Sequence, residues 1–247
     1  MKTLIVGAGE IGSNLSSILS KRYETKIIDK DNELDFEPEI MHICFPYSEE
    51  FIEAVKDYQK NYKPKYTIIH STVPVGTSKL CDAVHSPCMG IHPDLKESML
   101  TFTKYLGGED SSEVAQYFRR AGMKVYLTDK SETTELMKIL STSFYGLLIE
   151  WTKEVKDQCD EYDVPFEMWT HWTNNYNTGY EKLGHPEYHR PNLVPIKTKI
   201  KGHCILPNLE FLESKFTKLK EVKNNGKPRN IRTSSKGNRT KKKAKRK

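Results

Sequence analysis

Three glycines near the start of the chain have a spacing that can bind a phosphate group. Gly7, Gly9 and Gly12 form G-x-G-x-x-G within VGAGEIG, directly after an apolar run and before a helical pattern. In that setting the first glycine permits a tight turn, the second lets the backbone approach a pyrophosphate, and the third permits close helix–strand packing. Glu10 and Ile11 would begin the helix, whose N-terminal amides favour an anion.

An acidic residue follows at the distance that dinucleotide binding requires. Asp29 ends the second apolar run, KIIDKD, about twenty residues beyond the glycines, where a carboxylate can bind a ribose 2′-hydroxyl. It would repel a 2′-phosphate, so the pattern predicts NAD rather than NADP, although Lys26 and Lys30 reduce that preference. A glycine-rich turn without a ligand is the alternative interpretation.

A cysteine late in the chain could act as a nucleophile. Cys204 lies in KGHCILPN, between an irregular stretch and a helical one. Lys201, His203 or Lys138 could lower its pKa from the usual value of about 8.5 and so raise the thiolate fraction at neutral pH. A buried cysteine with no special role is the alternative.

A zinc site is a further interpretation of the same loop. His185, His189 and His203 lie close to Cys204 in the sequence, but Pro186 opposes the helix that would align the first two. The five cysteines are scattered and never form C-x-x-C. We therefore predict no metal site, no disulfide framework and reduced thiols.

The formal net charge of +6 combines two segments of opposite sign. Residues 215–247 hold fifteen of the 39 Lys and Arg residues and one of the 33 acids, so this tail carries about +14 and the rest about −8. From Lys223 onward the tail lacks large apolar residues except Ile231 and should be disordered. It could make nonspecific, salt-dependent contacts with nucleic acid or another acidic partner; a solvated linker without a partner is the alternative.

No stretch of the chain predicts insertion into a membrane. No run of eighteen apolar residues occurs, and Met1 leads directly into an apolar run without a preceding basic region or a following cleavage site. The expected location is therefore cytoplasmic.

The elements that would position these residues alternate along the first half of the chain. Strand-like runs alternate with amphipathic stretches, which indicates parallel strands joined by helical crossovers. The predicted fold class is α/β, with a Rossmann-type doubly wound parallel sheet over residues 1–130. The link between Asp29 and Ile40 is short and contains Pro38, so we expect a loop there. The expected strands are residues 2–9, 26–31, 40–46, 66–74, 81–88 and 123–129; the expected helices are residues 12–22, 48–62 and 112–122.

A helical domain is expected over residues 131–214. From Ser131 the apolar residues follow helical spacing for about two dozen residues, which predicts a long central helix capped by Ser131 or Thr133. Both of its faces are apolar near the middle, so packing against a second copy in a homodimer is expected. The Trp-, Tyr- and Asn-rich segment after Pro165 has no clean periodicity, and we interpret it as loops over a pocket.

Four further segments follow one another in a characteristic order: HSTVPVGT (70–77), YLGGED (105–110), VYLTDKSETTELMK (125–138) and KGHCILPNLEFL (201–212). Together they resemble the UDP-glucose/GDP-mannose dehydrogenase family, whose members oxidise nucleotide sugars, in order and approximate spacing over about residues 1–214. The resemblance implies NAD-dependent oxidation of a sugar primary alcohol, with Cys204 as nucleophile and Lys138 as the oxyanion-stabilising or base-shuttling group. It also implies that Thr72 positions water and that Ser71 and Thr72 contact the cofactor.

The chain departs from the family pattern at several functional positions. Asn208 stands where the family has an acid, Thr142 replaces an asparagine, and Lys201 replaces a glycine. No glutamate aligns after the fifth strand, and the family's final nucleotide-binding domain is missing. These departures favour a two-electron oxidation or a stalled thioester. A non-catalytic NAD-binding interaction module is the alternative function, in which Lys138 is a snorkelling surface lysine and Thr72 belongs to a strand-ending turn.

Overall fold

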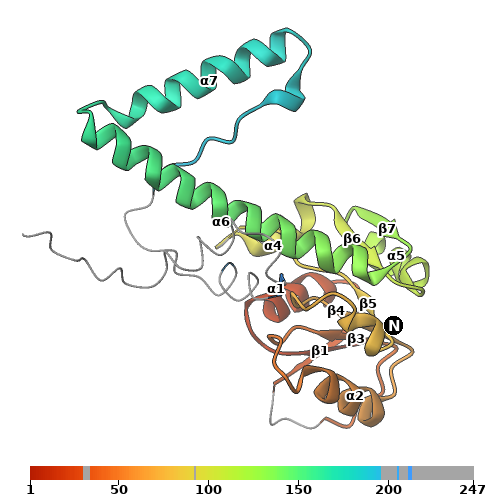
Figure 1. The fold of residues 1–247 in the computed structure, drawn as a ribbon. Helices are drawn as coiled ribbons and strands as arrows, with labels where there is room; N and C mark the ends of the chain where they lie inside the picture. Colours follow the sequence, from red (N-terminus) through yellow and green to blue (C-terminus); the bar gives the residue numbers. More distant parts are fainter. Residues whose placement is uncertain (30–33, 92, 196–204, 206–210, 213–247) are drawn as a thin grey trace, which may run out of the picture.

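The computed structural model describes residues 1–29, 34–91, 93–195, 205, 211 and 212. A seven-stranded sheet with flanking helices is built from the N-terminal half of the chain, and two long helices extend from it (Figure 1). None of the helices within these residues is both long and apolar enough to cross a membrane.

The sheet is mostly parallel, in the order β2-β1-β3-β4-β5-β6-β7. The β5–β6 pair is antiparallel and all other pairs are parallel. The doubly wound α/β prediction is confirmed, with one strand, β6, that the sequence analysis did not predict. The strands are β1 (Lys2–Val6), β2 (Glu24–Ile28), β3 (Ile40–Ile43), β4 (Tyr66–Ile69), β5 (Val84–His85), β6 (Lys104–Gly107) and β7 (Val125–Thr128).

Helices cover both faces of the sheet, so both faces of its central strands are buried. Ile5 and Ile40 belong to an apolar cluster shared with α1 and α5, whereas Leu4 and Met41 belong to a second cluster shared with α2. Side chains alternate between faces along a strand, which is why these strands are almost continuously apolar in sequence. The covering helices are α1 (Glu10–Leu19), α2 (Phe51–Tyr62), α3 (Thr77–Leu80), α4 (Leu95–Thr101) and α5 (Ser111–Arg120).

The link between β2 and β3 contains no helix in its described part. Residues 34–39 are irregular, as the sequence analysis predicted, and Leu34 and Phe36 pack against the apolar cluster that also contains α2. The short link therefore still contributes apolar surface to the core.

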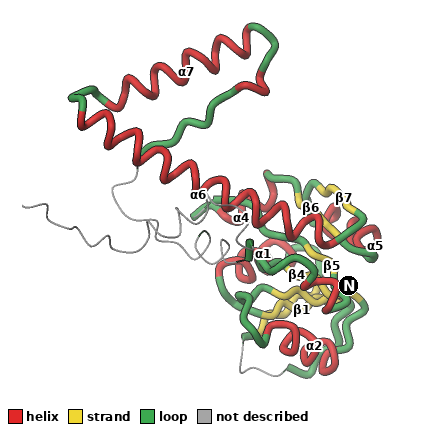
Figure 2. The backbone as a smooth tube through the Cα atoms, in the orientation of Figure 1, coloured by secondary structure: helices red, strands yellow, loops and turns green. Residues whose placement is uncertain are grey.

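Helix α6 (Ser131–Glu161) has 31 residues, longer than predicted. Its first turns lie against α3, β5, β6 and β7, and its second half projects beyond the sheet (Figures 1 and 2). The predicted caps are wrong. The N-cap is Lys130, and no side chain caps the helix.

The prediction of loops after Pro165 is also wrong. Helix α7 (Phe166–Lys182) occupies that segment, and a short 3₁₀ turn, η1 (Pro186–Tyr188), follows it. Pro165 stands at the N-cap and Gly184, with φ +76°, lies just beyond the C-terminus. A proline at the start and a glycine after the end are ordinary helix boundaries, and the aromatic residues between them obscured the pattern.

A row of buried polar side chains crosses the apolar core. The ring nitrogens of His42 lie 2.8 Å from His70 Nε2 and 3.0 Å from the Tyr117 hydroxyl. The Tyr117 oxygen lies 3.1 Å from Thr3 Oγ1, and His70 Nδ1 lies 2.7 Å from the carbonyl oxygen of Ser86. Because a carbonyl only accepts, His70 carries its proton on Nδ1, and the bonds then run in one direction from Thr3 to Ser86.

Candidate functional site

The glycine turn has the shape that dinucleotide binding needs. Gly7 has φ +104°, and a Cβ on it would lie 2.9 Å from the backbone after β3. A Cβ on Gly12 would lie 1.9 Å from the Gly7 carbonyl oxygen. A Cβ on Gly9 would meet nothing within 4 Å. Gly7 and Gly12 therefore serve the fold, whereas Gly9 keeps the backbone open beside the N-terminus of α1, where a pyrophosphate can approach.

This turn lies where the order of the sheet reverses. The connection after β1 runs to β2 on one side, whereas the connection after β3 runs to β4 on the other side. The two connections diverge and open a crevice between the carboxyl ends of β1 and β3. The Gly7 amide donates to the Ile28 carbonyl at 2.9 Å, which places the end of β2 beside the glycine turn. Asp29 follows Ile28 directly and is exposed. Asp29, predicted to bind the ribose, and the glycine turn, predicted to bind the pyrophosphate, are thus neighbours.

A continuous line of contacts joins this turn to α6. The Ser71 hydroxyl donates to the Phe45 carbonyl, and Phe45 belongs to the backbone that Gly7 approaches. His85 Nε2 lies 3.2 Å from the Ser71 carbonyl and His85 Nδ1 lies 2.8 Å from Thr134 Oγ1. The carboxyl ends of β1, β3, β4 and β5 and the first turn of α6 therefore form one edge.

His85 is neutral in this position. Burial lowers its pKa to about 3. The Ser71 carbonyl can only accept, so a hydrogen bond to it requires the His85 proton on Nε2. Thr134 Oγ1 lies 2.8 Å from His85 Nδ1 and 2.9 Å from the Ser131 carbonyl oxygen, and its single proton can serve one of these two acceptors. Thr72 directly follows Ser71 and is half-buried, and its hydroxyl has no hydrogen-bond partner among the described residues. It is available to a ligand.

Glu135 fixes the turn that follows Thr72. Its side chain is fully buried, and its two carboxylate oxygens accept from the Gly76 amide at 2.6 Å and the Ser78 amide at 2.8 Å. Hydrogen bonds to a charged acceptor are stronger than neutral ones. The carboxylate thus ties α6 to the segment that ends β4.

Lys138 lies one turn of α6 beyond Glu135. It is half-buried, and its ammonium donates to the Cys88 carbonyl, which follows β5, at 2.8 Å. The Thr142 hydroxyl donates to the Lys138 carbonyl at 3.0 Å. In this arrangement Thr142 has no proton left to give an oxyanion, unlike the amide of an asparagine.

Cys204 and Asn208 lie outside the described residues, as do His203 and Lys201. Their neighbours Ile205 and Phe211 are described. Ile205 is buried beside Gly146 of α6, where a Cβ on the glycine would lie 2.8 Å from Ile205 Cγ2. The ring centroids of Phe211 and Tyr47 lie 5.3 Å apart.

Two other thiols are unsuited to nucleophilic chemistry. Burial raises the pKa of Cys44, and it raises that of Cys81 to about 11, so both stay protonated at neutral pH.

The histidines considered as zinc ligands pair with carboxylates. His185 Nδ1 lies 3.0 Å from Glu187 Oε1, and His189 Nε2 lies 3.0 Å from Glu181 Oε2. Within the part of the chain that the structure describes, no group of three or more His, Cys, Asp or Glu side chains is placed to hold a metal ion.

Sequence reasoning missed the polar groups that organise this edge. Glu135 stands in the matched segment SETTELMK, but only its burial shows that it binds backbone amides. His85 and Lys104 lie in strand-like or unassigned runs. Burial lowers the pKa of Lys104 to about 8, and its ammonium lies 3.3 Å from the Ser86 carbonyl. A polar residue inside an apolar strand is the one signal that could have identified them.

The fold resembles those of NAD(P)-dependent dehydrogenases. UDP-D-ManNAc dehydrogenase from Pyrococcus horikoshii matches with a TM-score of 0.71 at 16% identity over 91% of this chain and 68% of that one. UDP-glucose dehydrogenase from Pyrobaculum islandicum matches with a TM-score of 0.67 at 12% identity, again over 91% and 68%. Mycobacterium tuberculosis 3-hydroxyisobutyrate dehydrogenase matches with a TM-score of 0.65 at 11% identity, over 91% and 92%.

No protein-family model and no curated protein sequence matches the chain. At these identities the structural matches establish the fold alone. The protein has a Rossmann dinucleotide-binding fold, consistent with NAD(P), followed by a long helix and a helical C-terminal region like those of nucleotide-sugar and 3-hydroxyacid dehydrogenases.

Proposed function

We propose that the protein is an NAD-dependent dehydrogenase that oxidises the primary alcohol of a sugar or sugar derivative. The observation that carries the proposal is the line of contacts from the Gly7–Gly12 turn through Ser71 and His85 to the helix of Lys138. Along this line lie the glycine turn, which would bind the pyrophosphate, and the half-buried ammonium of Lys138, which would act on the alcohol. NAD would accept the hydride from the alcohol carbon.

The chain's own residues would bind the cofactor and handle the proton. The amides beginning at Glu10 and Ile11 would hold the pyrophosphate, and Asp29 would hold the adenosine ribose. Lys138 would stabilise the alkoxide that forms as the alcohol loses its proton. Thr72 would position water or the nicotinamide side of the cofactor.

Cys204 would retain the aldehyde after the first oxidation. Its thiolate attacks the carbonyl carbon and gives a thiohemiacetal; a second hydride transfer gives a thioester, which water hydrolyses to the acid and the free thiol. Ile205, the next residue in the chain, is buried against the helix that carries Lys138. Asn208 cannot act as the base for hydrolysis, so the thioester should persist longer than with an acid at that position.

NADH absorbance with a panel of nucleotide sugars, sugars and sugar alcohols tests this proposal. Wild type should complete two oxidations of one substrate, and Cys204→Ala should stop after the first. The matched control is Cys159→Ala, a partly exposed thiol on α6. Binding of NAD with no turnover of any substrate would contradict the enzyme proposal, and four-electron oxidation by Cys204→Ala would contradict the role of the thiol.

A two-electron oxidation of a small hydroxy acid is the second candidate. It is favoured by one observation: the match to 3-hydroxyisobutyrate dehydrogenase covers 92% of that protein, whereas the matches to UDP-sugar dehydrogenases cover 68%. The same assay separates the two candidates, because 3-hydroxy acids would be turned over with one NADH per substrate and without dependence on Cys204.

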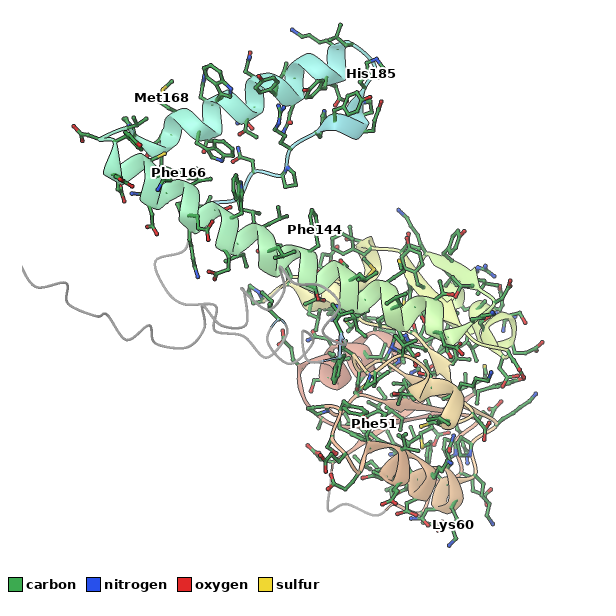
Figure 3. The ribbon with its side chains drawn as sticks, in the orientation of Figure 1. Phe51, Lys60, Phe144, Phe166, Met168 and His185 are labelled. Atoms are coloured by element: carbon green, nitrogen blue, oxygen red, sulfur yellow. The ribbon has the colours of Figure 1, made fainter. Side chains whose placement is uncertain are left out.

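We also propose that α6 forms a homodimer with a second copy. Met137, Phe144 and Trp151 recur every seven residues and are 52%, 56% and 55% exposed. Figure 3 shows Phe144 projecting from the middle of α6 away from the sheet. A seven-residue apolar repeat packs against another helix. Phe144→Glu should convert a dimer to a monomer in sedimentation velocity; a monomeric wild type at micromolar concentration would contradict this.

The basic tail is proposed to bind nucleic acid or another acidic partner without sequence preference. Residues 215–247 carry a formal charge of about +14, and six contacts to phosphates would lose roughly 10³-fold in affinity between 50 and 200 mM salt. Removal of residues 223–247 should abolish retention on single-stranded DNA and leave NAD binding unchanged. Retention that survives this deletion would place the nucleic-acid contacts on the body.

A further inference from the structure

Two adjacent residues of α6 hold both ends of the turn that follows β4. Thr134 reaches the beginning of the turn through His85, whose Nε2 lies 3.2 Å from the Ser71 carbonyl. Glu135 reaches the end of the turn through the amides of Gly76 and Ser78. Thr72 lies between these two attachments. We call the pair Thr134 and Glu135 the α6 clamp.

All three side chains of this arrangement are buried. Glu135 and His85 are 0% exposed and Thr134 is 3% exposed. The turn itself is not a regular element, since Gly76 has φ +96° and α3 has only four residues. Its own hydrogen bonds are local, from the Thr77 amide and hydroxyl to the Pro74 carbonyl at 3.1 and 2.7 Å. The contacts from Thr134 and Glu135 are the ones that place it relative to α6.

The clamp also fixes the distance between the turn and Lys138. Lys138 lies three residues after Glu135 and therefore on the same side of the helix. A displacement of the first turn of α6 would move the ammonium and the turn together. The turn that carries Thr72 and the side chain of Lys138 are thus both attached to the same part of α6.

We propose that Glu135 is a positioning residue that sets the nicotinamide half of the cofactor site relative to Lys138. This inference rests on the proposed dehydrogenase function. Asp29 and the glycine turn lie toward β2 and serve the adenosine and pyrophosphate half, so the other half of the dinucleotide extends across β3 toward β4 and the clamped turn. Glu135 touches neither cofactor nor substrate and acts through the turn.

Glu135→Gln tests the clamp directly. A glutamine keeps the shape but presents an amide donor to one of the two backbone donors, so one hydrogen bond is lost. Amide hydrogen exchange at Gly76 and Ser78 should accelerate by about tenfold to a hundredfold, as expected when a charged acceptor is removed. Glu132→Gln, on the same turn of α6, is the matched control and should leave both amides protected. Unchanged exchange in Glu135→Gln would overturn the clamp.

Ligand binding then separates a positioning role from a purely structural one. Glu135→Gln should weaken NADH about tenfold and ADP-ribose, which lacks the nicotinamide, by less than twofold. Turnover should fall in kcat more than in KM for the alcohol, by about a hundredfold, because small misplacements of reacting groups are costly. Equal effects on NADH and ADP-ribose, or none on either, would overturn the positioning role even if exchange accelerates.

Two further variants cover misfolding and an inactive enzyme. Glu135→Asp keeps the charge and should restore part of the NADH affinity, and Thr134→Val should release only the Ser71 end. Both keep the test open if Glu135→Gln does not fold. If wild type binds NADH and turns over no substrate, the enzyme proposal fails while the NADH and ADP-ribose comparison still decides this one. If wild type binds neither ligand, both proposals fail.

Discussion

At the scale of single residues, the three glycines of the N-terminal turn have separable roles. Gly12 has no room for a Cβ, whereas Gly9 has open space at the position a ligand would approach. A Cβ therefore harms the fold at one position and ligand binding at the other. The same turn supplies a test for cofactor binding that needs no substrate.

Gly9→Ala should fold with nearly normal stability but bind NADH at least about tenfold more weakly, because its methyl group would occupy the path of the pyrophosphate. Gly12→Ala should lose about 2–4 kcal/mol of stability, since its Cβ would clash with the Gly7 carbonyl. Thermal unfolding and NADH fluorescence titration measure the two effects. Equal NADH affinity in Gly9→Ala and wild type would contradict dinucleotide binding at this turn.

The sequence predicted residues whose role follows from local spacing and missed those whose role follows from distant partners. Gly7, Gly12 and Asp29 act within one strand–helix–strand unit, so their spacing carries the information. Glu135 and His85 bind backbone groups nearly sixty and about fifteen residues away in the sequence. A backbone amide is present at every position, so no pattern in the sequence marks these partners.

At the scale of elements, α6 was predicted in the right place and α7 was missed. The apolar residues of α6 repeat over many turns, and length made that signal strong. α7 has Trp172 and Tyr176 exposed at 61% and 40%, and its one fully buried position is Thr173. A helix with aromatic residues outside and a threonine inside gives no usual amphipathic pattern. β6 was missed for a related reason, because it contains the buried Lys104.

Gly146 makes a testable contact between α6 and the segment that contains Cys204. Alanine normally favours a helix over glycine by about 1 kcal/mol, but here its Cβ would lie 2.8 Å from Ile205 Cγ2. Gly146→Ala alone should therefore lower the free energy of unfolding. In an Ile205→Ala background the same change should raise it by about 1 kcal/mol. Urea denaturation of wild type, the two single variants and the double variant gives the coupling free energy between the two positions. Additive changes in the free energy of unfolding would show that Ile205 does not pack against Gly146.

At the scale of the whole molecule, buried histidines make stability depend on pH. Burial lowers the pKa of His42 and of His85 to about 3 and lowers that of His70 well below 6.5. In the unfolded chain each would titrate near 6.5. The unfolded state therefore binds more protons below that value, and the stability that is complete above pH 6.5 is lost as the pH falls toward 3.

Acid titration of stability should show this directly. Three such groups give a slope of about 4 kcal/mol per pH unit once the unfolded state is fully protonated. His42→Gln keeps hydrogen-bonding groups and removes one titration, so it should reduce the slope by about a third. His171→Gln, an exposed residue of α7, should leave it unchanged. Urea midpoints between pH 7 and 5 provide the measurement, and an identical slope in His42→Gln would contradict burial of a neutral ring.

Lys104 should make the stability of the fold depend on pH in the alkaline range. Burial lowers its pKa from 10.5 to about 8, so between these values the unfolded state keeps a proton that the folded state has lost. Its contribution to stability therefore rises with pH over this window, by up to about 3 kcal/mol. Comparison of wild type with Lys104→Met isolates the effect from other groups. In urea denaturation, the free energy of unfolding of wild type should rise relative to that of Lys104→Met between pH 8 and pH 10. A relative stability that does not change with pH would contradict the prediction.

The directional row from Thr3 to Ser86 also has a consequence for folding. Its members come from β1, β3 and α5 and from the residues that directly follow β4 and β5, and each donates to the next. A partly assembled sheet that has buried some of these groups leaves the others without partners, which is costly in a nonpolar interior. Intermediates with a half-built core are therefore disfavoured. We expect the sheet to assemble in one cooperative step, after the chain has been completed at least through α5.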